Sequence, residues 1–262
     1  MSLRRIWAVA LQEVFITARS VEVIVDLPWF SVMTIVVFGF ITRFLSTVID
    51  SSVARYLFLG TLLWEVIRIA QYSMSLGALW NIWSRNFCNM FITPLSMVEY
   101  VVAQMVSATA KAVLVFLIVA GVAALAFGFN MFAIGLGNLA LLFLNLLVFA
   151  WSIGLLVLGI ILRLGTRIQA LAWGLVFLFQ PLSAAYYPLA ILPPTLQAVA
   201  RAFPTTYVFE AARDSLAHPA IRWDYMGLAG LENVLYFAVC TAFYAFMYRR
   251  ARQTGQFARN EE

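Results

Sequence analysis

Charged and polar side chains recur at helical spacing inside two apolar segments of this chain, 54–79 and 97–127. The set comprises Glu65, Arg68 and Tyr72 in the first segment, and Gln104 and Lys111 in the second. Intervals of three, four and seven residues place the side chains of each segment on one helical face. An unpaired charge at the centre of a bilayer costs about 2.5–3.5 kcal/mol. We therefore expect both polar faces to be turned toward protein or toward a cavity.

Two roles are open for these polar faces. They can line a path for a polar substrate headgroup, or they can form an ion-pair cluster that holds the two segments together. Glu65 and Lys111 are equally far along the chain from Cys88. Antiparallel helices joined near Cys88 would bring Glu65, with its neighbour Arg68, to the depth of Lys111. We therefore predict that these three charges meet.

The composition indicates an all-α integral membrane protein. Of the 262 residues, 64% are hydrophobic and 11% are charged, whereas soluble domains carry about 25% charged residues. A membrane helix needs roughly 20 apolar residues, so we expect six transmembrane helices in a single domain, 1–262. The predicted spans are 27–41, 54–79, 97–127, 132–162, 168–179 and 225–248.

The ends of the chain predict its orientation. Residues 1–22 have the pattern of an amphipathic helix that lies in the membrane interface with its arginines toward lipid headgroups. With the N-terminus inside, ten arginines fall on the inner side and five on the outer side. Because positive residues concentrate on the cytoplasmic side, we expect both termini to be cytoplasmic.

A second amphipathic pattern lies between the second and third predicted spans, in the segment 80–93. Trp80, Trp83 and Met90 share one face of a helix, while Arg85 and Asn89 lie on the other. We predict one short helix on the inner surface, and the alternative is a surface turn with interfacial tryptophans. Ser96 and Glu99 then form a capping box that begins the third span.

The segment 180–213 is rich in proline yet apolar. It holds five of the eight prolines, namely Pro181, Pro188, Pro193, Pro194 and Pro204. Proline interrupts a helix, and irregular backbone at membrane depth is tolerated only beside protein or a water-filled cavity. We predict a re-entrant helical hairpin between the fifth and sixth spans. Pro181, Tyr186, Tyr187 and Pro188 at its break are the expected outer gate.

The order of motifs in this hairpin resembles the permease subunits of type-2 ATP-binding-cassette (ABC) exporters. The motifs are Pro-Leu-Ser-x-x-Tyr-Tyr-Pro, Leu-Pro-x-x-Leu-Gln, Phe-Pro-Thr-Thr-Tyr and Glu-x-x-Arg, in the family's order. The resemblance implies two short outer helices between the fifth and sixth spans. It also makes the segment 80–93 the coupling helix that docks on an ATPase, with Trp83, Arg85, Asn86 and Asn89 as contact residues.

The same resemblance implies the function. The chain would be a transport subunit and not an enzyme, exporting a lipid, a lipid-linked glycan or a hydrophobic drug across the bacterial cytoplasmic membrane. Its expected partners are a second copy of itself and a separate ATPase subunit that holds ATP and magnesium. We expect no cofactor, no metal and no nucleic acid on this chain. The rivals are an ATP-independent secondary carrier and an intramembrane enzyme that uses Glu65 and Lys111.

Overall fold

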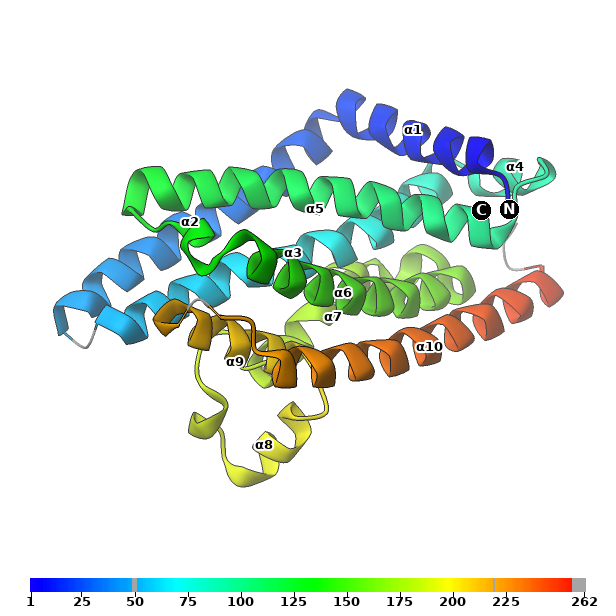
Figure 1. Ribbon diagram of the computed structural model, residues 1–262. Coiled ribbons are helices and arrows are strands. Elements are labelled where there is room, and N and C mark those ends of the chain that lie inside the picture. The colour runs from blue at the N-terminus through cyan, green and yellow to red at the C-terminus, as the bar shows by residue number, and fades with distance from the viewer. Residues whose placement is uncertain (49–50, 219, 256–262) are drawn as a thin grey trace.

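The computed structural model describes residues 1–48, 51–218 and 220–255, and the regular elements in these ranges are helices (Figure 1). The α-helices are α1 (Leu3–Arg19), α2 (Val21–Val48), α3 (Ser51–Trp83), α4 (Phe87–Ile92), α5 (Met97–Phe127), α6 (Leu136–Leu164), α7 (Gln169–Phe179), α8 (Pro194–Ala200), α9 (Pro204–Ala217) and α10 (Trp223–Gln253). Short 3-10 turns connect several of them. The prediction of an all-helical chain is confirmed.

Four helices in the described part of the chain are long and apolar enough to cross a bilayer. They are α2 over Val23–Val48, α5, α6 and α10. Helix α3 has 33 residues, but its polar residues keep it outside this set. Helix α7 has 11 residues, about half the length that a bilayer requires. Four apolar helices of this length indicate a membrane protein.

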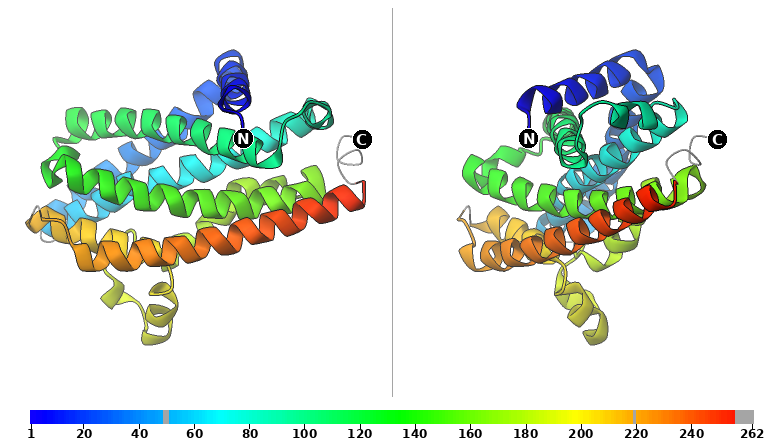
Figure 2. Two further views of the ribbon diagram at one scale, coloured as in Figure 1. Left: turned by 45° about the vertical axis from the view of Figure 1, so that its right-hand side comes forward. Right: turned by 90° about the vertical axis from the view of Figure 1, so that its right-hand side faces the viewer.

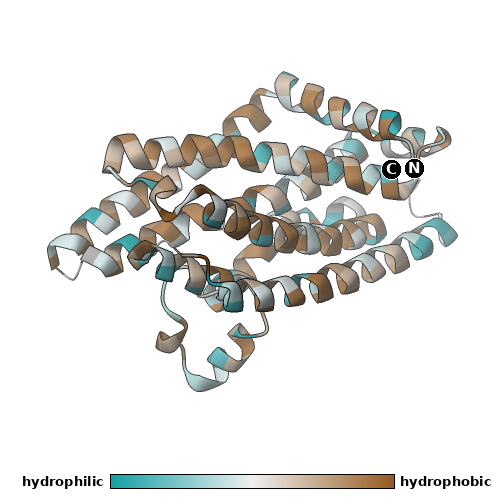
Figure 3. Ribbon diagram, in the orientation of Figure 1, coloured by the Kyte–Doolittle hydropathy of each residue, from teal (hydrophilic) through white to brown (hydrophobic). Residues whose placement is uncertain are grey.

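The long helices form one bundle with α3 at its centre. Helix α3 packs against α2, α5 and α6, and α10 packs against α6. The N-terminus, the end of α10 and α4 lie at one end of this bundle (Figure 1). Hydrophobic residues dominate the long helices, and hydrophilic residues gather toward their ends and on α1 (Figure 3). In the left view of Figure 2, α1 is seen end-on while the long helices run across the page. Helix α1 therefore crosses the direction of the bundle, as an interfacial helix would.

Local capping explains where α5 begins and ends. The Glu99 backbone N–H donates to Ser96 Oγ at 3.2 Å, and the Ser96 N–H donates to the Glu99 carboxylate at 2.9 Å. At the other end, Gly128 adopts a left-handed φ of 67°, and its N–H donates to the Ala124 carbonyl. The following Phe129 N–H reaches back to the Ala123 carbonyl. These two bonds satisfy carbonyls of the last turn, with glycine at the left-handed position that ends the helix, and the predicted bounds are confirmed.

Helix α2 differs from the predicted first span of 27–41. It begins at Val21, passes through Pro28 and continues to Val48. Proline is tolerated in membrane helices where neighbouring groups satisfy the freed carbonyl. The longer helix brings Asp26, which lies before the predicted span, into the helical bundle.

The predicted single helix over 80–93 is wrong. Helix α3 continues to Trp83, and the chain then turns at Arg85, whose φ is +52°. The Arg85 N–H donates to the Ile82 carbonyl and the Asn86 N–H to the Asn81 carbonyl, both at 2.9 Å. These two bonds form a Schellman motif, here with arginine at the left-handed position that glycine usually occupies. The turn separates α3 from the short helix α4.

The segment between α7 and α9 leaves the bundle sideways and carries α8 (Figures 1 and 2). Two residues of α9 form hydrogen bonds to the first part of this segment. Arg213, which is 5% exposed, donates to the Ala184 carbonyl at 2.7 Å, and Glu210 accepts from the Leu189 N–H at 2.8 Å and from Arg213 at 2.7 Å. The Glu-x-x-Arg motif thus fixes the turn that surrounds Tyr186.

Candidate functional site

A cavity of about 660 Å³ lies between α2, α3, α7 and the turn that follows α7. Its walls are largely aromatic. The aromatic lining consists of Phe30 and Phe38 from α2, Trp64, Trp80 and Trp83 from α3, Trp173 and Phe177 from α7, and Tyr186 from the turn. Cavities of this size with apolar walls and a few polar groups are typical of small-molecule sites.

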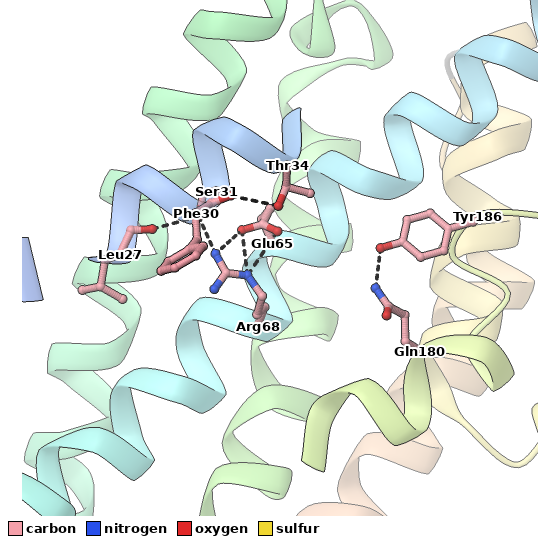
Figure 4. A network of polar contacts seen from close by, with 8 residues as sticks. All are labelled: Leu27, Phe30, Ser31, Thr34, Glu65, Arg68, Gln180 and Tyr186. Carbon is pink, nitrogen blue, oxygen red and sulfur yellow. Dashed lines mark hydrogen bonds and ion pairs between the residues drawn. The ribbon is translucent and has the colours of Figure 1, made fainter. Parts of the chain in front are cut away.

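The polar side of this cavity is built on α3. Arg68 donates through Nε to both Glu65 carboxylate oxygens, at 3.0 and 3.2 Å, and through Nη2 to Glu65 at 2.6 Å (Figure 4). The same Nη2 donates to Ser31 Oγ on α2 at 2.6 Å. Glu65 is 2% exposed. A buried carboxylate with an arginine one turn away is a satisfied pair, and through Ser31 the pair also joins α3 to α2.

A second carboxylate reaches the cavity from α2. Asp26 lines the cavity and accepts a hydrogen bond from the Tyr72 hydroxyl. The sequence interpretation missed Asp26, although the signal was present: an acidic residue within an otherwise apolar segment marks a functional position by default. Tyr72, Glu65 and Arg68 come to this cavity as the predicted polar face of α3.

The other two residues of the predicted polar set lie elsewhere. Lys111 Nζ is 3.6 Å from Glu13 Oε2 on α1, and Gln104 donates to Glu13 Oε1 at 3.0 Å. The prediction that Glu65, Arg68 and Lys111 meet is therefore wrong. Helix α1 covers α5 with a face that includes Glu13, so it supplies the counter-charge for Lys111. The amphipathic pattern of residues 1–22 did not predict this contact.

One of the four predicted gate residues faces the cavity. The Tyr186 ring stacks on Phe38, with centroids 5.4 Å apart and an interplanar angle of 9°, and its hydroxyl accepts from Gln180 (Figure 4). Tyr187 donates to the Pro181 carbonyl, and Pro188 follows in extended conformation. Pro181, Tyr187 and Pro188 shape the turn, and Tyr186 closes that side of the cavity.

The predicted ATPase contacts follow α3 at its C-terminal end, where Trp83 lines the same cavity. Trp83 lines the cavity and meets Trp80 edge to face, with centroids 5.4 Å apart. Arg85 and Asn89 are exposed on the turn and on α4, and Asn86 precedes α4 without a side-chain cap bond. These four residues belong to the end of the bundle that holds α4, the N-terminus and the end of α10.

No grouping of three or more His, Cys, Asp or Glu side chains suited to a metal occurs among the residues that the structure describes. No family model matches the chain, and no curated protein matches it.

Proposed function

We propose that this chain is the permease subunit of an ATP-driven exporter of the type-2 ABC class, moving an amphipathic substrate out of the bacterial cytoplasm or its inner leaflet. The observation that carries the proposal is the cavity between α2, α3 and α7. It combines aromatic walls with the Glu65–Arg68 pair. Such a cavity suits a molecule with an apolar body and a polar head.

The proposal needs six crossings: the four apolar helices, helix α3, and helices α7 and α9 together. Helix α3 crosses the bilayer with its polar residues turned to the cavity and to α1, so none of its buried charges meets lipid. Helices α7 and α9, with 11 and 14 residues, measure about 16 and 21 Å at 1.5 Å per residue. Together they form one interrupted crossing, with the segment that carries α8 as the re-entrant part.

The orientation follows from the arginines. The end of the bundle that holds the N-terminus, α4 and the end of α10 is cytoplasmic, as the positive-inside rule requires. The turn at Arg85, with α4, then offers Trp83, Arg85, Asn86 and Asn89 to a separate ATPase. A second copy of the chain would cover the apolar residues that α2 and α7 expose beside the cavity, among them Val37 and Leu178.

The enzyme alternative loses support from the same geometry. Glu65 is committed to Arg68, and Lys111 to Glu13, in two separate networks. An acid and a base that do not converge on one cavity cannot act on one substrate.

Purification of the tagged chain from its native membranes in a mild detergent tests the proposal. We expect an ATP-binding subunit to be recovered in equal amount, with two copies of each chain in the native mass spectrum. Cross-linking between Val37→Cys or Leu178→Cys copies should trap the permease dimer. A monomer without an ATPase, together with transport that continues without ATP, would favour the secondary carrier.

A further inference from the structure

The charges around the 660 Å³ cavity do not balance. Among the described residues that line it, the ionised groups are the carboxylates Asp26 and Glu65 and the guanidinium of Arg68. Arg68 is held by Glu65 through three hydrogen bonds. Asp26 accepts from the Tyr72 hydroxyl, and no Lys or Arg of the described chain lies within ion-pair distance of it. One negative charge therefore faces the cavity without a counter-charge.

The side-chain carbonyl of Gln71, which also lines the cavity, lacks a hydrogen-bond donor in the described structure. Gln71 is fully buried, and its Nε2 donates to Ser75 Oγ at 2.9 Å and to the Ala172 carbonyl at 3.1 Å. Its carbonyl oxygen has no hydrogen-bond partner in the described structure. An unmade bond at a buried acceptor costs about 1–3 kcal/mol. A ligand N–H would satisfy this acceptor.

The aromatic walls favour the same kind of ligand. Trp173, Phe177 and Phe30 each leave about half of their side chains open, and all three line the cavity. The face of an aromatic ring attracts a cation within about 6 Å of its centroid, and tryptophan attracts it most strongly.

We infer that the substrate of this cavity is a cationic amphiphile: an apolar chain or ring system that carries a protonated amine, which is bound by Asp26, the Gln71 carbonyl and the aromatic faces. An anionic headgroup would have to draw Arg68 away from Glu65. That would leave a buried carboxylate unpaired, which is strongly unfavourable. The transport of this amphiphile rests on the proposed export function, whereas its binding does not.

Binding of matched dodecyl compounds to the purified full-length chain tests the inference. The probes are dodecylamine and dodecanoate at pH 7 in a neutral detergent, measured by quenching of tryptophan fluorescence and by native mass spectrometry. The wild-type chain should bind the amine at least about tenfold more tightly than the carboxylate, which is about 1.4 kcal/mol. This comparison needs no variant, so it does not depend on how a substitution folds.

Asp26→Asn isolates the charge, because asparagine retains a carbonyl oxygen for the Tyr72 hydroxyl. It should weaken amine binding about tenfold and leave dodecanoate binding no weaker. Asp224→Asn is the matched control, since Asp224 lies outside the cavity and pairs with Arg222. Equal binding of both probes by the wild type would overturn the inference, as would an Asp26→Asn variant that loses both probes alike.

The outcomes separate this inference from the proposed function. The binding measurements use neither ATP nor an ATPase subunit. If the amine preference depends on Asp26 but no ATPase co-purifies, the exporter proposal fails and the inference stands. If an ATPase co-purifies and the cavity prefers dodecanoate, the inference fails and the exporter proposal stands.

Discussion

Glu13 on α1 and Lys111 on α5 form an ion pair inside the protein, with 3.6 Å between Oε2 and Nζ. Glu13 is 2% exposed, and Gln104 donates to its other carboxylate oxygen. Gly77 on α3 leaves the space for this contact, since a Cβ there would lie 2.4 Å from Gln104 Oε1. A helix that sequence alone assigns to the membrane surface is thus joined to the bundle by a buried charge.

The first prediction concerns this pair. Glu13→Gln and Lys111→Met should each lower the free energy of unfolding by about 3–5 kcal/mol, because each leaves the other charge buried without a partner. The double variant should recover part of the loss. Thermal unfolding in detergent measures the cycle. Glu65→Gln is the matched control: combined with Lys111→Met its effect should be additive, since the two residues belong to separate networks. Strong coupling between Glu65 and Lys111 would instead mean that these two charges interact, contrary to the structure.

The second prediction concerns the turn around Tyr186. Gly60 on α3 lies directly under this turn, and a Cβ at that position would be 1.8 Å from the Ala185 carbonyl oxygen. Gly60→Ala should displace the turn and destabilise the protein by about 1–3 kcal/mol, as overpacking does.

The control for Gly60 is Gly174→Ala on α7, where a Cβ would meet no atom within 4 Å. Alanine there should be neutral or stabilising by up to about 1 kcal/mol through helix propensity. Limited proteolysis within 180–203 gives a second measurement, with faster cleavage expected in Gly60→Ala alone. Equal cleavage in both variants would mean that the turn does not depend on its contact with α3.

The third prediction separates backbone from side chain at Arg85. A left-handed conformation costs a non-glycine residue about 1–2 kcal/mol, so Arg85→Gly should fold at least as stably as the wild type while removing the guanidinium. Arg85→Ala removes the same group and keeps the strain. If this turn contacts an ATPase, both variants should lower substrate-stimulated ATP hydrolysis by about fivefold or more, the lower range of coupling between sites. Unchanged hydrolysis in Arg85→Gly would exclude the side chain from coupling.

The fourth prediction concerns orientation. Ser84 and Ala217 are both exposed, Ser84 in the turn before α4 and Ala217 at the end of α9. In a background without Cys88 and Cys240, Ser84→Cys should react with an impermeant maleimide only after the cells are opened. Ala217→Cys should react in intact cells, because it lies at the other end of the bundle. Labelling of both from the same side would reject the arrangement of six crossings with both termini inside. The side chain of the natural Cys88 lies outside the described residues, so Ser84 carries the label on this side.

Several features follow from residues close together in the chain. The apolar composition predicts a membrane protein of helices alone. Ser96 and Glu99 predict the start of α5, because a capping box is closed by hydrogen bonds within three residues. The prolines of 180–213 predict the interruption between α7 and α10, because each removes a donor from its own turn. These interactions are local, so the sequence determines them before any helix meets another.

The partner of each buried charge is decided only by the tertiary structure. Helical spacing placed Glu65 and Lys111 on polar faces, but it could not say which helix each face would meet. That choice depends on the packing of whole helices: α1 crosses α5 and brings Glu13 to Lys111, while α2 and α7 enclose the polar face of α3. The cavity and its uncompensated Asp26 arise in the same way. Contacts between residues far apart in the chain outweigh a local preference that is worth about 1 kcal/mol or less per residue.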